Sequence, residues 1–238
     1  IERLLAVQAL LALLAAAALA IALRRRGHER GEHAAIEGSA ARALWAMPVM
    51  RTLCGLVFLG FGIFVALATW LQTLLAPSGV SETEAGALLV AMVISGIVGC
   101  AVLPPLVARR ETERAFMRAT VIAACAGCVL LGVVSSLAGR AAVLVVIGLF
   151  LLPALPVILA ATERIAGAAA GSAGAIVWMA GNLGGLAIAL LVQALVHHPM
   201  AAFAAMGAVS LLGLPLAARL RLPTAEPLDS PRSAAPAR

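Results

Sequence analysis

Residues 141–162 have the sequence AAVLVVIGLFLLPALPVILAAT, a run of twenty-two positions that contains no charged side chain. An α-helix rises about 1.5 Å per residue, so about 20 apolar residues are needed to cross the roughly 30 Å hydrocarbon core of a bilayer. The run is therefore long enough and apolar enough to predict a membrane-spanning helix.

Six further charge-free windows of comparable length flank this run. The seven predicted spans are residues 4–23, 52–76, 85–108, 119–138, 141–162, 168–196 and 200–218. The whole chain is 63% hydrophobic and 12% charged, whereas soluble domains are about 45–50% apolar and about 25% charged. The composition predicts an all-α membrane protein with seven transmembrane helices, and it excludes a soluble enzyme, a disordered chain and a secreted disulfide scaffold.

The net charge of +6 comes from arginine, because the 238 residues include no lysine. The arginines gather in alternate linkers between the spans, which predicts membrane orientation and no nucleic-acid partner. If the linker after residue 108 is cytoplasmic, 15 of the 17 arginines lie inside and only Arg3 and Arg140 lie outside. We therefore expect a multi-pass protein of the plasma or inner membrane with its C-terminus in the cytoplasm.

Two sequence stretches carry a resemblance to a known family. WLQTLLAPSGVSETEAGALL (residues 70–89) is similar to the extracellular turn between helices seven and eight of the major facilitator superfamily, and GSAGAIVWMAGNLGG (residues 171–185) is similar to its eleventh helix. Residues 99–114 occupy the place of the family's cytoplasmic gating motif and share its basic character. The order of one span, a polar linker and six more spans also resembles this family of twelve-helix transporters.

The resemblance implies that the chain is a fragment of a twelve-helix fold. Residues 1–23 would be the sixth helix, residues 24–46 the cytoplasmic central loop and residues 47–221 the C-terminal six-helix half. Residues 222–238 are rich in Pro, Ser and Ala and are expected to form a disordered cytoplasmic tail. Since the chain begins with Ile1 in an apolar run, we expect an N-terminal six-helix half to be missing from this sequence.

Polar side chains inside a span are the best indication of a substrate path, because an ionised group in lipid costs several kcal/mol unless it is paired or hydrated. No Asp, Glu, Arg or Lys lies at the centre of any predicted span, which favours a small uncharged or amphipathic organic solute over an anion. The candidates for substrate binding are Thr69, Trp70, Gln72, Thr73, Ser95, Trp178 and Asn182.

Several of these candidates also have an alternative interpretation. Gln72 can bond a neighbouring helix or lie with Trp70 at the membrane interface. Asn182 can bond across a helix interface, and Ser95 can lie in one, because small residues surround both. We expect glycines at GxxxG and related spacings to mark close helix packing; these are Gly96, Gly99, Gly167, Gly171, Gly181 and Gly185.

Charges near the cytoplasmic ends of the spans and prolines inside the fifth span are candidates for gating. Pro104 and Pro105 are expected to end the regular helix of the third span, and prolines inside the fifth span predict a kink there. Glu163 can either pair with an arginine of the linker at residues 109–118 or remain solvated. The gating candidates are Arg109, Arg110, Pro153, Pro156, Glu163 and Arg164.

No cluster of residues predicts catalysis, a metal or a cofactor. Cys125 and Cys128 form a C-x-x-C inside a span, without a second pair or a nearby His, so a zinc site is not expected. The sequence thus predicts secondary active or facilitated transport of a small organic solute by alternating access, with the bilayer as surroundings. The alternative is a membrane scaffold or subunit that transports nothing.

Overall fold

The computed structural model describes residues 13–14 and 41–220. The chain divides into units of residues 1–43 and 44–238, and nearly all of the described residues belong to the second unit. Its described part is helical, without a strand. The helices are α3 (Pro48–Leu75), η1 (Ala76–Ser78), α4 (Glu82–Arg110), α5 (Glu113–Val133), α6 (Leu137–Ala166), η2 (Gly167–Ala169), α7 (Ala170–Ala194), α8 (Pro199–Leu211) and α9 (Gly213–Arg219).

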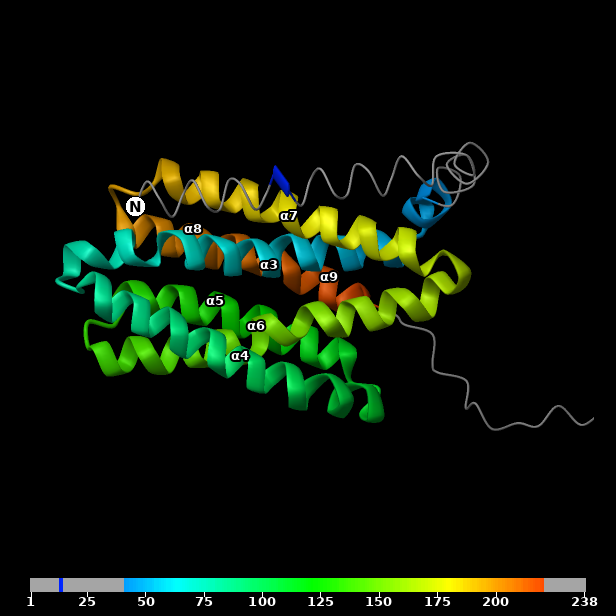
Figure 1. Ribbon diagram of the computed structural model, residues 1–238, viewed down its shortest axis with the longest axis horizontal. Helices are drawn as coiled ribbons and strands as arrows, with labels where there is room; N and C mark the ends of the chain where they lie inside the picture. Colours follow the sequence, from blue (N-terminus) through cyan, green and yellow to red (C-terminus); the bar gives the residue numbers. More distant parts are fainter. Residues whose placement is uncertain (1–12, 15–40, 221–238) are drawn as a thin grey trace, which may run out of the picture. The chain divides into compact units, whose positions relative to one another are not determined.

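Six of the predicted spans correspond to these helices. Among the described residues, five segments are long and apolar enough to cross a membrane, and one of them, Leu137–Ala194, has 58 residues. That segment consists of α6, η2 and α7, and the chain reverses direction between α6 and α7, as Figure 1 shows. The last crossing, Pro199–Arg219, combines α8 and α9. The predicted span at residues 4–23 lies outside the described residues, apart from Leu13 and Leu14.

The expected end of α4 at its two prolines was wrong. α4 continues through Pro104 and Pro105 to Arg110. Each proline removes one helix hydrogen bond, but membrane helices tolerate this loss where neighbouring groups compensate. The helix ends at Arg110, and the residue that caps it, Glu111, has a left-handed backbone with φ of 51° and an N–H that bonds to the Ala108 carbonyl.

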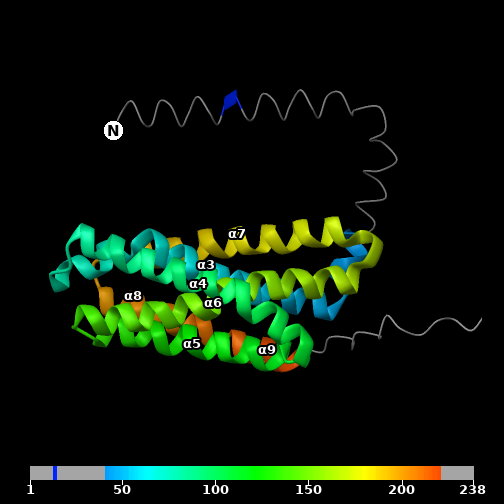
Figure 2. The ribbon, with the colours of Figure 1, turned by 60° about the horizontal axis from the view of Figure 1, so that its bottom comes forward.

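Two pairs of neighbouring helices run in the same direction, α3 with α7 and α4 with α6 (Figures 1 and 2). α7 packs on α3 through Gly184, where an added Cβ would overlap the carbonyl of Phe58. α6 packs on α4 in the same way through Gly148, which lies against the carbonyl of Met92. Both pairs are therefore held at a distance that only glycine permits at the contact.

The predicted packing role is confirmed for most of the glycines. Added Cβ atoms at Gly96 and Gly99 would lie 2.6 Å from atoms of α6, and one at Gly181 would lie 2.9 Å from Val57 of α3. The prediction was wrong for Gly167 and Gly171 as far as the described residues go, because an added Cβ there would meet none of their atoms within 4 Å. Gly167 instead has φ of 51° in the turn between α6 and α7, so its conformation rather than its packing requires glycine.

The two ends of the helical bundle differ in charge. One end, here called the basic end, contains the start of α3, the α4–α5 and α6–α7 turns and the end of α9 (Figures 1 and 2). The opposite end contains the turns at residues 76–81, 134–136 and 195–198, and Arg140 is the arginine of this unit that lies near it. The arginines at or near the basic end are Arg51, Arg109, Arg110, Arg114, Arg118, Arg164 and Arg219.

Candidate functional site: an apolar pocket between α3 and α6

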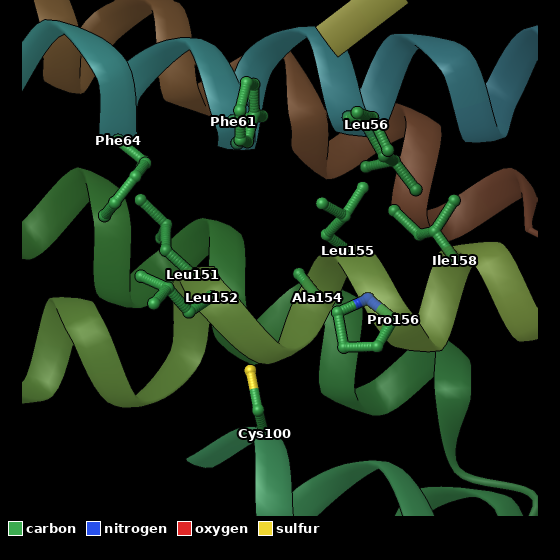
Figure 3. Close-up of a pocket in the computed structure, with 12 residues that line it drawn as sticks. Leu56, Phe61, Phe64, Cys100, Leu151, Leu152, Ala154, Leu155, Pro156 and Ile158 are labelled. Carbon is green, nitrogen blue, oxygen red and sulfur yellow. The ribbon is translucent and has the colours of Figure 1, made fainter. Parts of the chain in front are cut away.

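A pocket of about 290 Å³ lies between the two helix pairs, with walls from α3, α4 and α6 (Figure 3). It lies where two clusters of buried side chains meet, one toward each end of the bundle. It is therefore near mid-height of the spanning helices. Its lining residues are Leu56, Val57, Gly60, Phe61, Phe64, Cys100, Leu151, Leu152, Ala154, Leu155, Pro156 and Ile158.

The α3 wall follows from helical spacing. Leu56, Gly60 and Phe64 recur every four residues and so lie on one face of the helix. An added Cβ at Gly60 would meet no atom of the described residues within 4 Å, so the absent side chain leaves room that belongs to the pocket. In Figure 3, Phe64 points from α3 toward α6, and Phe61 lies beside it on α3.

The α6 wall contains a proline, and α4 adds a thiol. Pro156 has no N–H, so the carbonyl of Leu152 one turn earlier cannot accept the usual helix hydrogen bond from it. Cys100 points toward α6 from the α4 side in Figure 3 and brings the one polar side chain among the lining residues. The pocket offers apolar walls without any charged group, which suits an uncharged or amphipathic molecule.

The four candidates on α3 lie beyond the pocket, toward the opposite end. Thr69 is exposed, and its hydroxyl donates to the Val65 carbonyl at 2.8 Å. Gln72 and Thr73 are exposed, whereas Trp70 is half-buried and its Nε1 is buried without a hydrogen-bond partner. All four are described by the structure, and none of them lines the pocket.

The candidates on α4 and α7 divide into two groups. The Ser95 hydroxyl donates to the Met92 carbonyl at 2.8 Å and lies in the contact between α4 and α6. The structure brings Trp178 and Asn182 together, because the Asn182 side-chain amide donates to the Trp178 carbonyl at 2.9 Å. Trp178 packs edge-on against Phe61, with ring centroids 5.9 Å apart. Trp178 thus borders the pocket through Phe61 without lining it, and Asn182 bonds to the backbone of its own helix.

Sequence reasoning missed the lining residues because it searched the spans for polar groups. The chain has 6 Phe and 3 Trp among 238 residues, and two of those Phe lie three positions apart on α3 beside Gly60. A glycine next to closely spaced aromatic residues within an otherwise bulky span was the available signal. No group of three or more His, Cys, Asp or Glu that could hold a metal occurs in the described part of the chain.

The gating candidates lie near the basic end, except for the two prolines inside α6. Arg164 and Glu113 form an ion pair at 2.6 Å that joins the end of α6 to the start of α5. Glu163 is exposed, in agreement with the solvated alternative, because consecutive helical residues point in different directions and Arg164 is the one that faces α5. Arg109 and Arg110 are exposed in the last turn of α4, where the helix dipole favours positive charge.

The prolines of α6 have different surroundings. Pro153 is buried, and its ring lies 2.7 Å from where a Cβ would be at Gly99 of α4. Pro156 lines the pocket (Figure 3). Pro153 therefore belongs to the α4–α6 contact, whereas Pro156 belongs to the pocket.

Comparison with known proteins identifies the family. Residues 4–189 match the family model described as Major Facilitator Superfamily, and this match covers more than half of the chain. The chain therefore belongs to the major facilitator superfamily, a class of multi-pass membrane transporters. It is also similar to an uncharacterized protein of Archaeoglobus fulgidus, with 28% identity over 141 residues. That match covers 59% of this chain and 65% of the relative, so it spans less than two thirds of the relative's length.

Proposed function

We propose that this chain is the C-terminal half of a carrier that moves a small uncharged or amphipathic organic solute by alternating access. The pocket between α3 and α6 would be this half's share of the substrate path. The observation that carries the proposal is the character of the pocket, which is apolar, lies at mid-height and has Cys100 as its one polar lining side chain.

The packing of the helices supports movement at the pocket. α3 and α7 touch through backbone at Gly184, and α4 and α6 touch through backbone at Gly148. At the level of Gly60, α3 and α6 do not touch through a glycine. The pocket and the side chains that line it lie between the two helices instead. Each pair can therefore move as a unit, with the change in geometry concentrated at the seam between the pairs.

The same proposal includes an orientation and a partner. Positive residues mark the cytoplasmic side of a membrane protein, so the basic end would face the cytoplasm of a plasma or inner membrane, together with the C-terminus. The second wall of the substrate path would come from an N-terminal six-helix half. No charged residue lines the pocket, so a coupled carrier would need its titrating group in that half.

Transport by the full-length protein in proteoliposomes tests the proposal. A panel of labelled small solutes, both uncharged and anionic, is added outside while a dye reports the internal pH. We expect an uncharged or amphipathic solute to enter in preference to the anions. Proton movement that depends on the solute would indicate a coupled carrier, and uptake without it a facilitator. A folded protein that moves none of the solutes would contradict the proposal and favour the scaffold alternative.

A further inference from the structure

Arg140 is the exceptional arginine of the bundle. It lies in the first turn of α6, near the opposite end, and is only 4% exposed. Its Nε donates to the Val134 carbonyl at 2.8 Å, at the end of α5. Its Nη1 is buried and has no hydrogen-bond partner. One nitrogen of a fixed positive charge is thus left unsatisfied inside the protein.

A buried guanidinium needs an anion. Arginine stays protonated in proteins, and a buried charge without a partner costs several kcal/mol. The ion pair found among the described residues joins Arg164 and Glu113. It lies at the basic end and does not involve Arg140. Of the acids near the opposite end, Glu82 is exposed and Glu84 accepts hydrogen bonds from Ser81. No described carboxylate therefore balances Arg140.

Arg140 forms part of the wall of a second pocket, of about 240 Å³. The other walls come from the ends of α3 and α5, from η1 and from the start of α8, and they are mainly apolar. The first N–H groups of α8 have no partner within the helix, and the helix dipole adds positive potential there. The remaining lining residues are Leu74, Leu75, Pro77, Ser78, Leu131, Gly132, Pro199, Met200 and Phe203.

We propose that this pocket binds the phosphate of an anionic phospholipid, with Arg140 as the charged contact and the apolar walls against the glycerol and first acyl carbons. A water molecule takes up about 30 Å³ in the liquid, so the pocket holds a group several times larger than one water. Its position at the ends of the spanning helices is the depth at which lipid headgroups lie. Apolar walls favour the lipid over free phosphate. The inference goes beyond the proposed transport function and does not depend on it.

The test measures thermal unfolding of the full-length protein in detergent with increasing phosphatidylglycerol, phosphatidylcholine or inorganic phosphate. Arg140→Gln removes the charge but keeps a long polar side chain, and Arg118→Gln is the matched control at an exposed position near the basic end. We expect phosphatidylglycerol to stabilise the wild type and Arg118→Gln. Arg140→Gln should need at least about tenfold more phosphatidylglycerol to reach the same stabilisation, as expected for loss of a charged hydrogen bond.

A second variant covers the case in which Arg140→Gln does not fold. Ser78→Phe narrows the pocket from an exposed position and keeps Arg140 in place, and it should weaken the lipid effect in the same way. Equal stabilisation of the wild type and the pocket variants by phosphatidylglycerol would overturn the site. Stabilisation by inorganic phosphate as strong as by the lipid would overturn the lipid as its ligand and indicate a free-anion site.

Discussion

Gly184 shows how a single residue sets the distance between two helices. Its Cα faces the backbone of Phe58 on α3, and an added Cβ would overlap the Phe58 carbonyl. A backbone group cannot rotate away as the end of a side chain can. Any other residue at this position must therefore push α3 and α7 apart. Gly174 lies on the same helix, but its Cβ position meets nothing within 4 Å.

The first prediction compares these two glycines. Gly184→Ala should destabilise the protein by about 1–3 kcal/mol, because overpacking at a close contact forces the backbone to shift. Gly174→Ala should be neutral or slightly stabilising, because alanine is the better helix former. Thermal unfolding of the full-length protein in detergent measures both changes. Equal unfolding midpoints for the two variants would contradict the close contact between α3 and α7.

The residue scale also shows where sequence reasoning succeeded and where it did not. Gly181 and Gly185 were predictable as packing residues from their GxxxG spacing, and the structure places both against α3. Gly60 was harder to recognise as part of a pocket: the closely spaced Phe61 and Phe64 beside it were the available signal, but a glycine in a span predicts packing unless the opposite wall is known. The opposite wall is formed by α6 and includes Pro156. Because Gly60 and Pro156 are far apart in the sequence, the sequence alone does not show that they line the same pocket.

At the scale of elements, α6 has one part that packs on α4 and another that borders the pocket. Its first half packs on α4 through Gly148, whereas Pro156 lies farther along, where the helix borders the pocket. The proline removes the hydrogen bond that would join residue 156 to the Leu152 carbonyl, so α6 bends more easily there. α4 contains a comparable proline, Pro105, which is exposed and does not line the pocket.

The second prediction concerns the flexibility of α6. Pro156→Ala restores an N–H and a helix hydrogen bond at the pocket, so we expect stability to stay equal or rise while the transport rate falls severalfold. Pro105→Ala restores the same type of bond in α4 and should leave the rate unchanged. Initial rates of uptake into proteoliposomes, with unfolding midpoints measured in parallel, test both. The same rate in both proline variants would show that bending at Pro156 does not limit transport.

The helices were predictable from charge-free windows, but their ends were not. The window at residues 119–138 begins after Arg118, whereas α5 starts at Glu113 and ends at Val133. The first turns of α5 contain charged residues and lie outside the charge-free window. A search for charge-free windows therefore cannot detect this part of the helix. At its other end, Ser136 caps α6 by accepting a hydrogen bond from the Gly139 N–H, so the break between the helices comes before the window ends.

At the scale of the whole molecule, the segregation of charge determines the expected orientation. The α4–α5 turn at the basic end is flanked by four arginines, whereas the turn at residues 76–81 is followed by Glu82 and Glu84 at the start of α4. The positive-inside rule therefore predicts that the former turn lies in the cytoplasm and the latter outside. The order of the helices agrees, because α4 connects these two turns in one crossing.

The third prediction tests this orientation in cells. Thr83→Cys and Arg110→Cys place exposed thiols at the two ends of α4 in a full-length protein whose native cysteines are replaced. A membrane-impermeant maleimide should label the cysteine at position 83 in intact cells and the one at position 110 only after the membrane is opened. The reverse pattern would invert the proposed topology.

The central claim is that the pocket beside Gly60 carries the substrate, and filling that pocket tests it most directly. Gly60→Leu places a side chain where nothing lies within 4 Å of the new Cβ, and Gly174→Leu does the same away from the pocket. We predict that Gly60→Leu lowers solute uptake into proteoliposomes by about tenfold or more, since 1.4 kcal/mol of steric conflict suffices for that factor. Gly174→Leu should keep the wild-type rate. Undiminished uptake by a folded Gly60→Leu protein would contradict the account.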